Sequence, residues 1–470
     1  MSAKRIALFK YGSSRQRGGV LLIMLVILVV GIAALLVSSL TSSSAKTARQ
    51  KNTSAALAQA KDALIGYAVI YGDTHSGQVH GYLPCPDYAG GNPEGSAEPS
   101  CGSQNVSVIG RLPWATLDLS TLRDGDGECL WYAVSGTYKN SPKTGLMNWD
   151  TNGQFQVYSS DGTLLASQVV AVIFAPGAPL SDQSQNRSPD GTAPICGGNY
   201  TVGNYLDTGT VNTVSFNNAA IASGNFIQGT SGGSINDQMM FITRQDIWNA
   251  VQKRTDFNTM LNLLTQRVAE CLANYGNNNS NYNNNSLPWP AQLVLSDYAV
   301  NNNYIDVPNT SYSNSYSYSG RVPYVVNNSD SASGNSISYP YSLLQSNGAN
   351  CPNPANWAAI YPWYDNWKDH LFYALSNEFG PQYGNTNACG SCVTVNGNKY
   401  AAVVIFANSR IGTQVRTSSA ARDNISNYLE SNNATNYPDT SGMKSYKTAT
   451  SSINDVLYCI KQDLSVVPCP

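Results

Sequence analysis

The apolar stretch RGGVLLIMLVILVVGIAALLV, Arg17–Val37, decides how the rest of the chain is interpreted. No charge occurs from Gly18 to Ala45, and the sixteen residues before this stretch contain bases but no acid. In a helix, the segment Val20–Val37 would span about 27 Å, which is close to the hydrocarbon thickness of a bilayer. The sequence therefore predicts a membrane-spanning helix, with its basic flank in the cytoplasm.

The helix is expected to continue past the apolar stretch. Residues 38–71 contain no proline and a single glycine. Three interpretations are open: an anchor joined to a separate amphipathic helix, one rod of about 50 residues, or a secretory signal cleaved near Ala45. The rod is favoured because apolar residues recur at helical spacing, namely Leu57, Ala60, Leu64, Tyr67, Ala68 and Tyr71.

From Arg15 to Tyr71 the chain resembles the type IV pilin and type II secretion pseudopilin superfamily, whose members have a short basic leader ending in glycine before an apolar helix. The resemblance implies cleavage and N-methylation by a prepilin peptidase at Gly18, Gly19 or Val20. It also implies a helix for membrane insertion and filament assembly, starting with Leu21, Leu22, Ile23, Met24, Leu25, Val26, Ile27 and Leu28.

The chain departs from major pilins at mature position five, where they carry a glutamate. Ile23 or Met24 stands there, depending on the cleavage bond. Tip pseudopilins and some minor pilins also lack this glutamate, so the resemblance implies a tip or initiating subunit. The motifs LPCPD (83–87), GRLPW (110–114) and DGDGECLWYAVS (124–135) are similar to exported prepilin-type proteins of Gram-negative bacteria.

Composition is typical of an exported protein. Only 12% of the 470 residues are charged, about half of the usual ~25%, and the net charge of −2 gives no indication of nucleic-acid binding. The ten cysteines fit an oxidising compartment. Their spacing favours two local pairs, Cys85 with Cys101 and Cys459 with Cys469, and a structural disulfide at Cys389 and Cys392, closed on itself or shared with other cysteines.

Short motifs occur twice in the same order, which predicts an internal duplication. The clearest pairs are GRLPW (110–114) with GRVPY (320–324), LWYAVS (130–135) with LFYALS (371–376), VIFA (172–175) with 404–407, NYLD (204–207) with NYLE (427–430), and SIND (234–237) with 452–455. In each copy a helix ending in Tyr-Gly precedes short apolar strands. Helices are expected over residues 245–275, 361–378 and 418–430.

These patterns predict an α+β fold: a long N-terminal membrane-spanning helix followed by two duplicated pilin-like modules, each a helix packed on an antiparallel sheet. The expected divisions are a basic leader (1–19), a transmembrane and amphipathic helix (20–72), a first module (73–247) and a second module (248–470). The Asn-rich stretches 276–286 and 301–337 are expected to form loops.

No pattern predicts an enzyme, because HExxH and P-loop motifs are missing from the sequence. Asp124, Asp126 and Glu128 offer three carboxylates to calcium, but an EF-hand requires glutamate at loop position twelve, where Ser135 stands. No cofactor is expected. The three histidines are expected at the surface or in hydrogen bonds.

The resemblance thus implies a large minor pilin or pseudopilin. It is expected in the bacterial inner membrane with a cytoplasmic N-terminus and a periplasmic bulk, and outside the cell once assembled. Expected partners are other pilin subunits, the inner membrane, prepilin peptidase and a surface or substrate ligand, without nucleic acid. A tethered or secreted adhesin with no filament role is the alternative, and an exported hydrolase is a further one.

Overall fold

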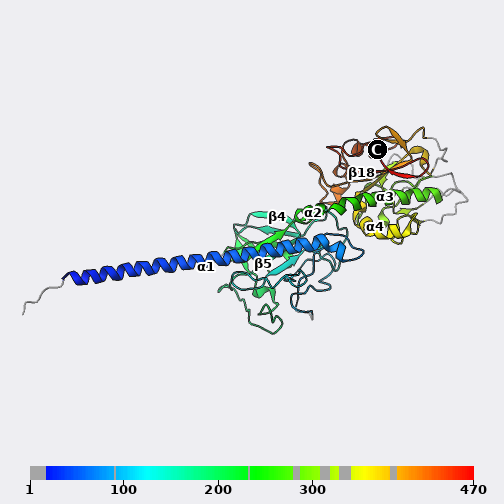
Figure 1. Cartoon of the computed structure of the whole chain (residues 1–470). Helices are drawn as coiled ribbons and strands as arrows, with labels where there is room; N and C mark the ends of the chain where they lie inside the picture. The colour runs from blue at the N-terminus through cyan, green and yellow to red at the C-terminus, as the bar shows by residue number, and fades with distance from the viewer. Residues whose placement is uncertain are drawn as a thin grey trace, which may run out of the picture.

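The chain forms a long helix followed by two globular modules (Figure 1). The computed structural model describes residues 17–88, 92–230, 233–278, 286–306, 318–327, 340–381 and 389–470, with side chains from residue 44 onward. Its α-helices are α1 Arg17–Thr74, α2 Arg244–Gln252, α3 Thr255–Asn278, α4 Pro354–Trp367, α5 Ser419–Arg422 and α6 Ser431–Thr435.

Helix α1 contacts the first module only through its C-terminal part. It has 58 residues, which corresponds to about 87 Å. The side chains of residues 44–52 are exposed, and burial begins at Thr53 and continues along one stripe with Leu57, Ala60 and Leu64. Figure 1 shows the N-terminal half of α1 extending away from the first module.

The predicted membrane-spanning helix requires a correction. Within the described part of the chain, none of the helices combines the length and the apolar character needed to cross a bilayer. This finding contradicts the membrane-spanning helix and the single-pass location in the inner membrane, and neither is retained. The side chains of residues 17–43 lie outside the described part.

The first module is built in layers around a four-stranded antiparallel sheet. Alternation along β2 sends Tyr132 and Val134 toward α1, and Trp131 and Ala133 toward a smaller sheet on the other face. The main sheet has the order β1 Val108–Arg111, β2 Trp131–Val134, β5 Ala171–Ala175, β9 Gln238–Ile242. The smaller sheet joins β4 Leu164–Val169, β3 Phe155–Tyr158 and β8 Asn225–Ile227, and a hairpin joins β6 Thr208–Val211 to β7 Val214–Asn217.

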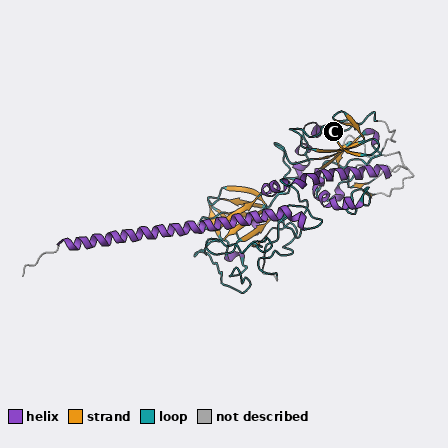
Figure 2. Cartoon of the chain, viewed as in Figure 1, coloured by secondary structure: helices purple, strands orange, loops and turns teal. Residues whose placement is uncertain are grey.

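The second module repeats this layered plan, with α3 and α4 on one face of its main sheet and a small sheet on the other (Figure 2). The main sheet has the order β10 Ser319–Arg321, β13 Leu371–Leu375, β16 Ala402–Phe406, β18 Val456–Ile460, β19 Val466–Pro468. The small sheet joins β15 Asn398–Tyr400, β14 Val393–Val395 and β17 Ser445–Tyr446, and β11 Val325–Val326 pairs with β12 Tyr341–Ser342.

The repeated motifs occupy equivalent positions in the two main sheets. In the first, Gly110 lies opposite Tyr132, and Tyr132 lies opposite Ile173. In the second, Gly320 lies opposite Tyr373, and Tyr373 lies opposite Val404. The strand order is therefore the same in both modules, but the third strand is shifted by one residue relative to the motifs, because Ile405, the counterpart of Ile173, lies opposite Phe372.

The prediction of a single antiparallel sheet per module is wrong. The described residues form six sheets, and two strand pairs, β3 with β8 and β14 with β17, are parallel. These small sheets arise from the long loops between main-sheet strands, which fold back over the second face. Side chains such as Trp131 and Phe372 point to that face and need cover.

Predicted helix boundaries also differ from the structure. The helix expected over 245–275 is interrupted between α2 and α3, where Arg254 turns back to bind both carboxylate oxygens of Asp73 at 2.6 and 3.0 Å. The helix expected over 361–378 lies earlier, at Pro354–Trp367, and the one over 418–430 is reduced to short turns. Much of the two Asn-rich stretches lies outside the described residues.

Candidate functional site

A loop of the first module, residues 146–151, packs against the second module. Asn148 shapes the loop because its Oδ1 accepts a hydrogen bond from the backbone N–H of Asp150 at 2.9 Å. The Asn148 amide also donates to the carbonyl oxygen of Asn366 at 2.8 Å and to Asp369 Oδ1 at 3.1 Å. The loop is thus fixed to the end of α4 and the start of β13.

This contact places a buried carboxylate of the first module among cationic side chains of the second. Asp150 Oδ1 accepts from Arg410 Nε at 2.6 Å, and Oδ2 lies 3.3 Å from Arg416 Nη1 and 2.9 Å from His370 Nε2. The side chains of Asp150, His370 and Arg416 are all 0% exposed. A charge buried this deeply is tolerated only with such partners.

The carboxylates of Asp150 and of its neighbour Asp369 both stay ionised at neutral pH. Burial acts to raise the pKa of Asp150, but the hydrogen bond from His370 and the charges of Arg416 and Arg410 outweigh it, so the pKa falls well below its usual value. Burial also opposes ionisation of Asp369, yet His370 and Arg422 lower its pKa overall.

His370 links the two carboxylates. Its Nδ1 lies 2.9 Å from Asp369 Oδ1, while Nε2 lies 2.8 Å from Trp149 Nε1 and 2.9 Å from Asp150 Oδ2. Nε2 accepts from Trp149 when it holds a lone pair and donates to Asp150 when it carries a proton. Because both ring nitrogens face protein groups in a fully buried position, this cluster fastens the modules together.

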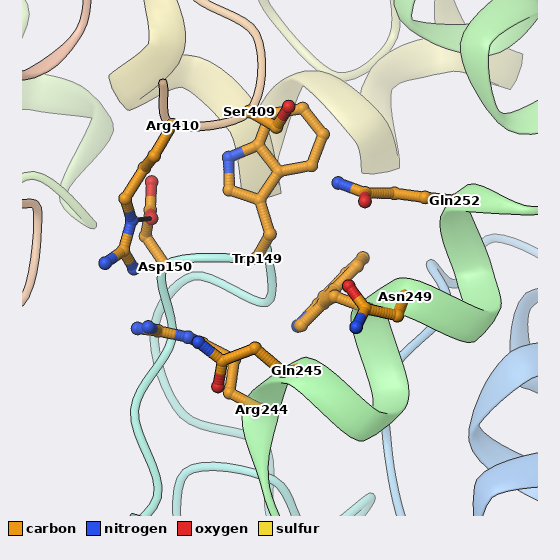
Figure 3. Close-up of a pocket in the computed structure, with 9 residues that line it drawn as sticks. Trp149, Asp150, Arg244, Gln245, Asn249, Gln252, Ser409 and Arg410 are labelled. Carbon is orange, nitrogen blue, oxygen red and sulfur yellow. Dashed lines mark hydrogen bonds and ion pairs between the residues drawn. The ribbon is translucent and has the colours of Figure 1, made fainter. Parts of the chain in front are cut away.

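An open pocket of about 250 Å³ lies beside this cluster, between α2 and the segment after β16 (Figure 3). Arg244 is the first residue of α2, and Thr243 and Asp246 form the capping box at the start of this helix. Arg244 Nη1 donates to Asn152 Oδ1 at 2.7 Å, and burial together with the charge of Arg410 lowers the Arg244 pKa. The pocket is therefore a cationic cavity at the junction of the modules.

The residues predicted from the resemblance lie along α1. Gly18, Gly19 and Val20 and the assembly residues Leu21 to Leu28 fall within its helical span, but their side chains are outside the described part. Their processing and assembly roles stay predictions.

The disulfides expected from the cysteine content are present. Cys85 joins Cys101, Cys459 joins Cys469, and Cys389 joins Cys392 directly before the hairpin of β14 and β15. Asn396 and Gly397 form that hairpin's turn with φ of +48° and +86°. Two further bonds have partners that the spacing left open, Cys129–Cys196 and Cys271–Cys351.

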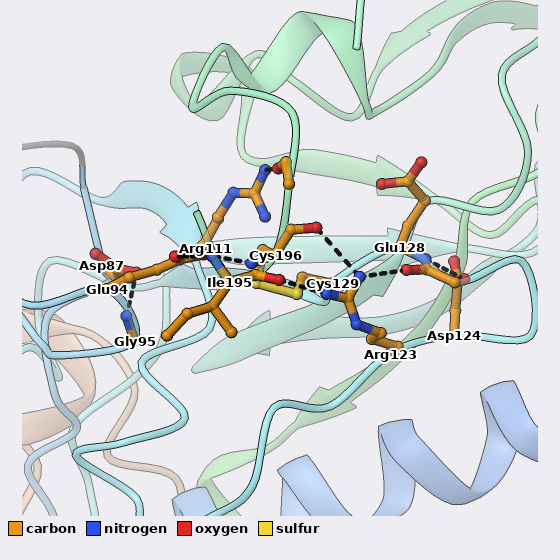
Figure 4. Close-up of a disulfide and its surroundings, with 12 residues drawn as sticks. Asp87, Glu94, Gly95, Arg111, Arg123, Asp124, Glu128, Cys129, Ile195 and Cys196 are labelled. Carbon is orange, nitrogen blue, oxygen red and sulfur yellow. Dashed lines mark hydrogen bonds between the residues drawn. A yellow bond between two sulfur atoms is a disulfide. The ribbon is translucent and has the colours of Figure 1, made fainter. Parts of the chain in front are cut away.

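The Cys129–Cys196 bond lies in a network of charged groups (Figure 4). The Glu94 carboxylate accepts from the backbone N–H groups of Ile195 and Cys196 at 2.6 and 2.7 Å, and Arg123 Nη2 donates to the carbonyl oxygen of Ile195 at 2.6 Å. Arg111, which is buried, donates to the carbonyl oxygen of Gly197 at 2.9 Å. These contacts hold the loop after the disulfide in place.

The three carboxylates considered for calcium have protein partners instead. Asp124 accepts backbone N–H groups from Asp126, Glu128 and Gly177. Asp126 pairs with Arg49, and Glu128 with Arg187. Among the described residues, no group of three or more histidine, cysteine or acidic side chains has the arrangement of a metal site.

The three histidines differ in environment. His75 stacks on Tyr71 with ring centroids 4.0 Å apart. His80 is buried with its ring 5.8 Å from that of Trp363, and burial lowers its pKa. His370 is the buried link of the module junction.

The buried Asp87 is expected to make the free energy of unfolding depend on pH. Burial raises its pKa to about 6, despite hydrogen bonds from Gly95 and Tyr200. Between the unfolded and folded pKa values the native state binds more protons, so stability should fall as pH rises from about 4 to about 6. We expect Asp87→Asn to remove about 1–2 kcal/mol of that decline, measured by urea unfolding at pH 4.5 and 7. An unchanged pH profile would contradict the assignment.

No protein-family model, curated protein or solved structure matches the chain. Sequence reasoning missed Asp150, Arg244 and Arg410 because they are far apart in sequence and belong to no motif. The only local signal was a lone histidine beside an aspartate, Asp369–His370, directly before a strand.

Proposed function

We propose that the protein is a structural subunit of a type IV pilus or type II secretion-like filament, at its tip or in its initiation. The observation that carries the proposal is the form of α1, one continuous helix that extends well beyond the module on which it packs (Figure 1). Residues 44–52 are exposed, and the contact of this part of α1 with the first module includes the surface ion pair of Arg49 with Asp126.

The sequence of the protruding part supports assembly through helix packing. Residues 18–45 are uncharged and largely apolar. A helix that is apolar all round is stable in water only when covered. Equivalent helices of neighbouring subunits would cover it, and they would form the filament core. Prepilin peptidase would act before assembly, at Gly18 or Gly19.

Two features support a terminal position in the filament. The subunit carries two modules at the end of one helix, which is a bulky arrangement for regular stacking (Figure 1). In addition, Ile23 or Met24 replaces the glutamate that major pilins use at mature position five.

A charge placed in the apolar part of α1 tests the proposal. We expect Val26→Asp to reduce recovery in the sheared filament fraction at least about tenfold, because a charge buried among packed helices is costly. The matched control is Ser44→Asp, which puts the same charge on an exposed position. Equal recovery of both variants would contradict the proposal. Urea unfolding should give equal head stability for both, because packing begins only at Thr53.

The alternative is an adhesin or binding protein without a filament role, and the cationic pocket at the module junction favours it. The mature N-terminus distinguishes the two. Mass spectrometry of the natural protein should find a methylated Gly19 or Val20 if the protein is a filament subunit. A start at Lys46 would instead indicate plain secretion.

A further inference from the structure

The pocket between the modules offers positive charge that the protein itself does not use. Within the described part of the chain, Arg410 makes its hydrogen bond through Nε alone, and Arg244 through Nη1 alone. The remaining N–H groups of both guanidinium groups have no acceptor among the described residues. Both side chains line the pocket and point toward the same side of it (Figure 3).

The charges around the pocket favour an anion. Asp150 is the one acidic residue among those that line it. Its carboxylate is already shared by Arg410, Arg416 and His370. Arg244 has no carboxylate partner in the described ranges, so its charge is left for a ligand. Arginine binds planar oxyanions such as carboxylates through two parallel hydrogen bonds.

The rest of the lining is suited to hydroxyl groups. Gln245, Asn249 and Gln252 lie at positions i, i+4 and i+7 of α2 and so share one face of the helix, and Ser409 lies across from them. Amides both donate and accept hydrogen bonds. Trp149 and Trp248 add aromatic surface. At about 250 Å³ the cavity is smaller than the ~300–1,000 Å³ of drug-sized sites, which limits the ligand to about one ring.

We propose that this pocket binds an acidic sugar residue, with the carboxylate held by Arg244 and Arg410 and the ring hydroxyls held by the amides of α2. The pocket includes residues of both modules, so the site exists only when the modules are docked. This proposal does not depend on the filament role and holds equally for a secreted binding protein.

Calorimetric titration of the full chain with glucuronate tests the proposal. We expect saturable binding of glucuronate and no binding of glucose, which lacks the carboxylate. Arg244→Gln should weaken glucuronate binding at least about tenfold, since a hydrogen bond between charged groups is lost. Lys253→Gln is the matched control, because it removes the same charge from an exposed residue next to α2 that does not line the pocket.

A second variant separates a loss of ligand binding from a loss of folding. Asn249 is exposed, so Asn249→Ala should leave the melting temperature unchanged and still weaken glucuronate binding severalfold. Equal affinities for glucuronate and glucose would overturn the proposal. So would acetate or inorganic phosphate binding as tightly as glucuronate, or wild-type affinity in both Arg244→Gln and Asn249→Ala.

Discussion

Replacing Asp150 by alanine should lower the free energy of unfolding by about 3–5 kcal/mol, the cost of leaving buried cations without their carboxylate. Arg416 is fully buried and depends on Asp150 for its nearest negative charge. His370 and Arg410 lose a partner in the same step. Because the carboxylate comes from one module and its partners from the other, the loss should also undock the modules.

Urea unfolding followed by tryptophan fluorescence measures this effect, since Trp149 is the residue next to Asp150. Limited proteolysis of the native state then reports whether the junction has opened. Asp182→Ala is the control, because Asp182 is exposed and its removal should change stability by less than about 0.5 kcal/mol. A loss of under about 1 kcal/mol for Asp150→Ala would show that the cluster does not stabilise the junction.

The second large effect is expected at Trp367, the centre of an aromatic cluster between the modules. Its ring lies 4.3 Å from that of Trp149 and 5.6 Å from that of Trp248, measured between centroids, and its side chain is completely buried. Trp149 comes from the first module and Trp248 from α2. The ring of Phe406, in β16, has its centroid 5.9 Å from that of Trp367. Trp367→Ala should therefore cost about 3–5 kcal/mol through lost contacts and the cavity left behind.

Trp367→Phe is the matched variant and should cost less than about 1.5 kcal/mol, because most of the ring is kept. The indole Nε1 has no hydrogen-bond partner in the described part of the chain, so phenylalanine loses no polar contact there. Similar losses for both substitutions would mean that the indole's size and position, rather than aromatic packing in general, are essential. Trp367 and Asp150 both contact the region of His370, so their combined effect should not be additive.

The strands of the two main sheets were predictable from sequence because they are short, apolar and repeated. LWYAVS and LFYALS correspond to β2 and β13, and the turn Asn396–Gly397 lies where the hairpin requires positive φ. The helical character of residues 38–71 was equally readable, from the lack of proline and the spacing of Leu57, Ala60 and Leu64.

The small sheets and the module junction were not predictable, for a physical reason. Parallel pairing of β3 with β8 joins residues about 70 positions apart, and no local pattern records such a contact. Asp150 and Arg410 are separated by 260 residues. Their ion pair depends on how the modules dock. The sequence around Asp150 contains no motif that predicts this contact.

The pattern of crosslinks has a mechanical consequence for a protein pulled through α1. Each disulfide joins cysteines of one module, and the widest two, Cys129–Cys196 and Cys271–Cys351, enclose separations of 67 and 80 residues. A chain under tension cannot release the length held inside such a loop. At about 3.4 Å per residue, each of these crosslinks withholds more than about 200 Å of extension. A head torn open by force would therefore lengthen by less than its full contour length, and its sheets could re-form from a chain still tied near its native contacts.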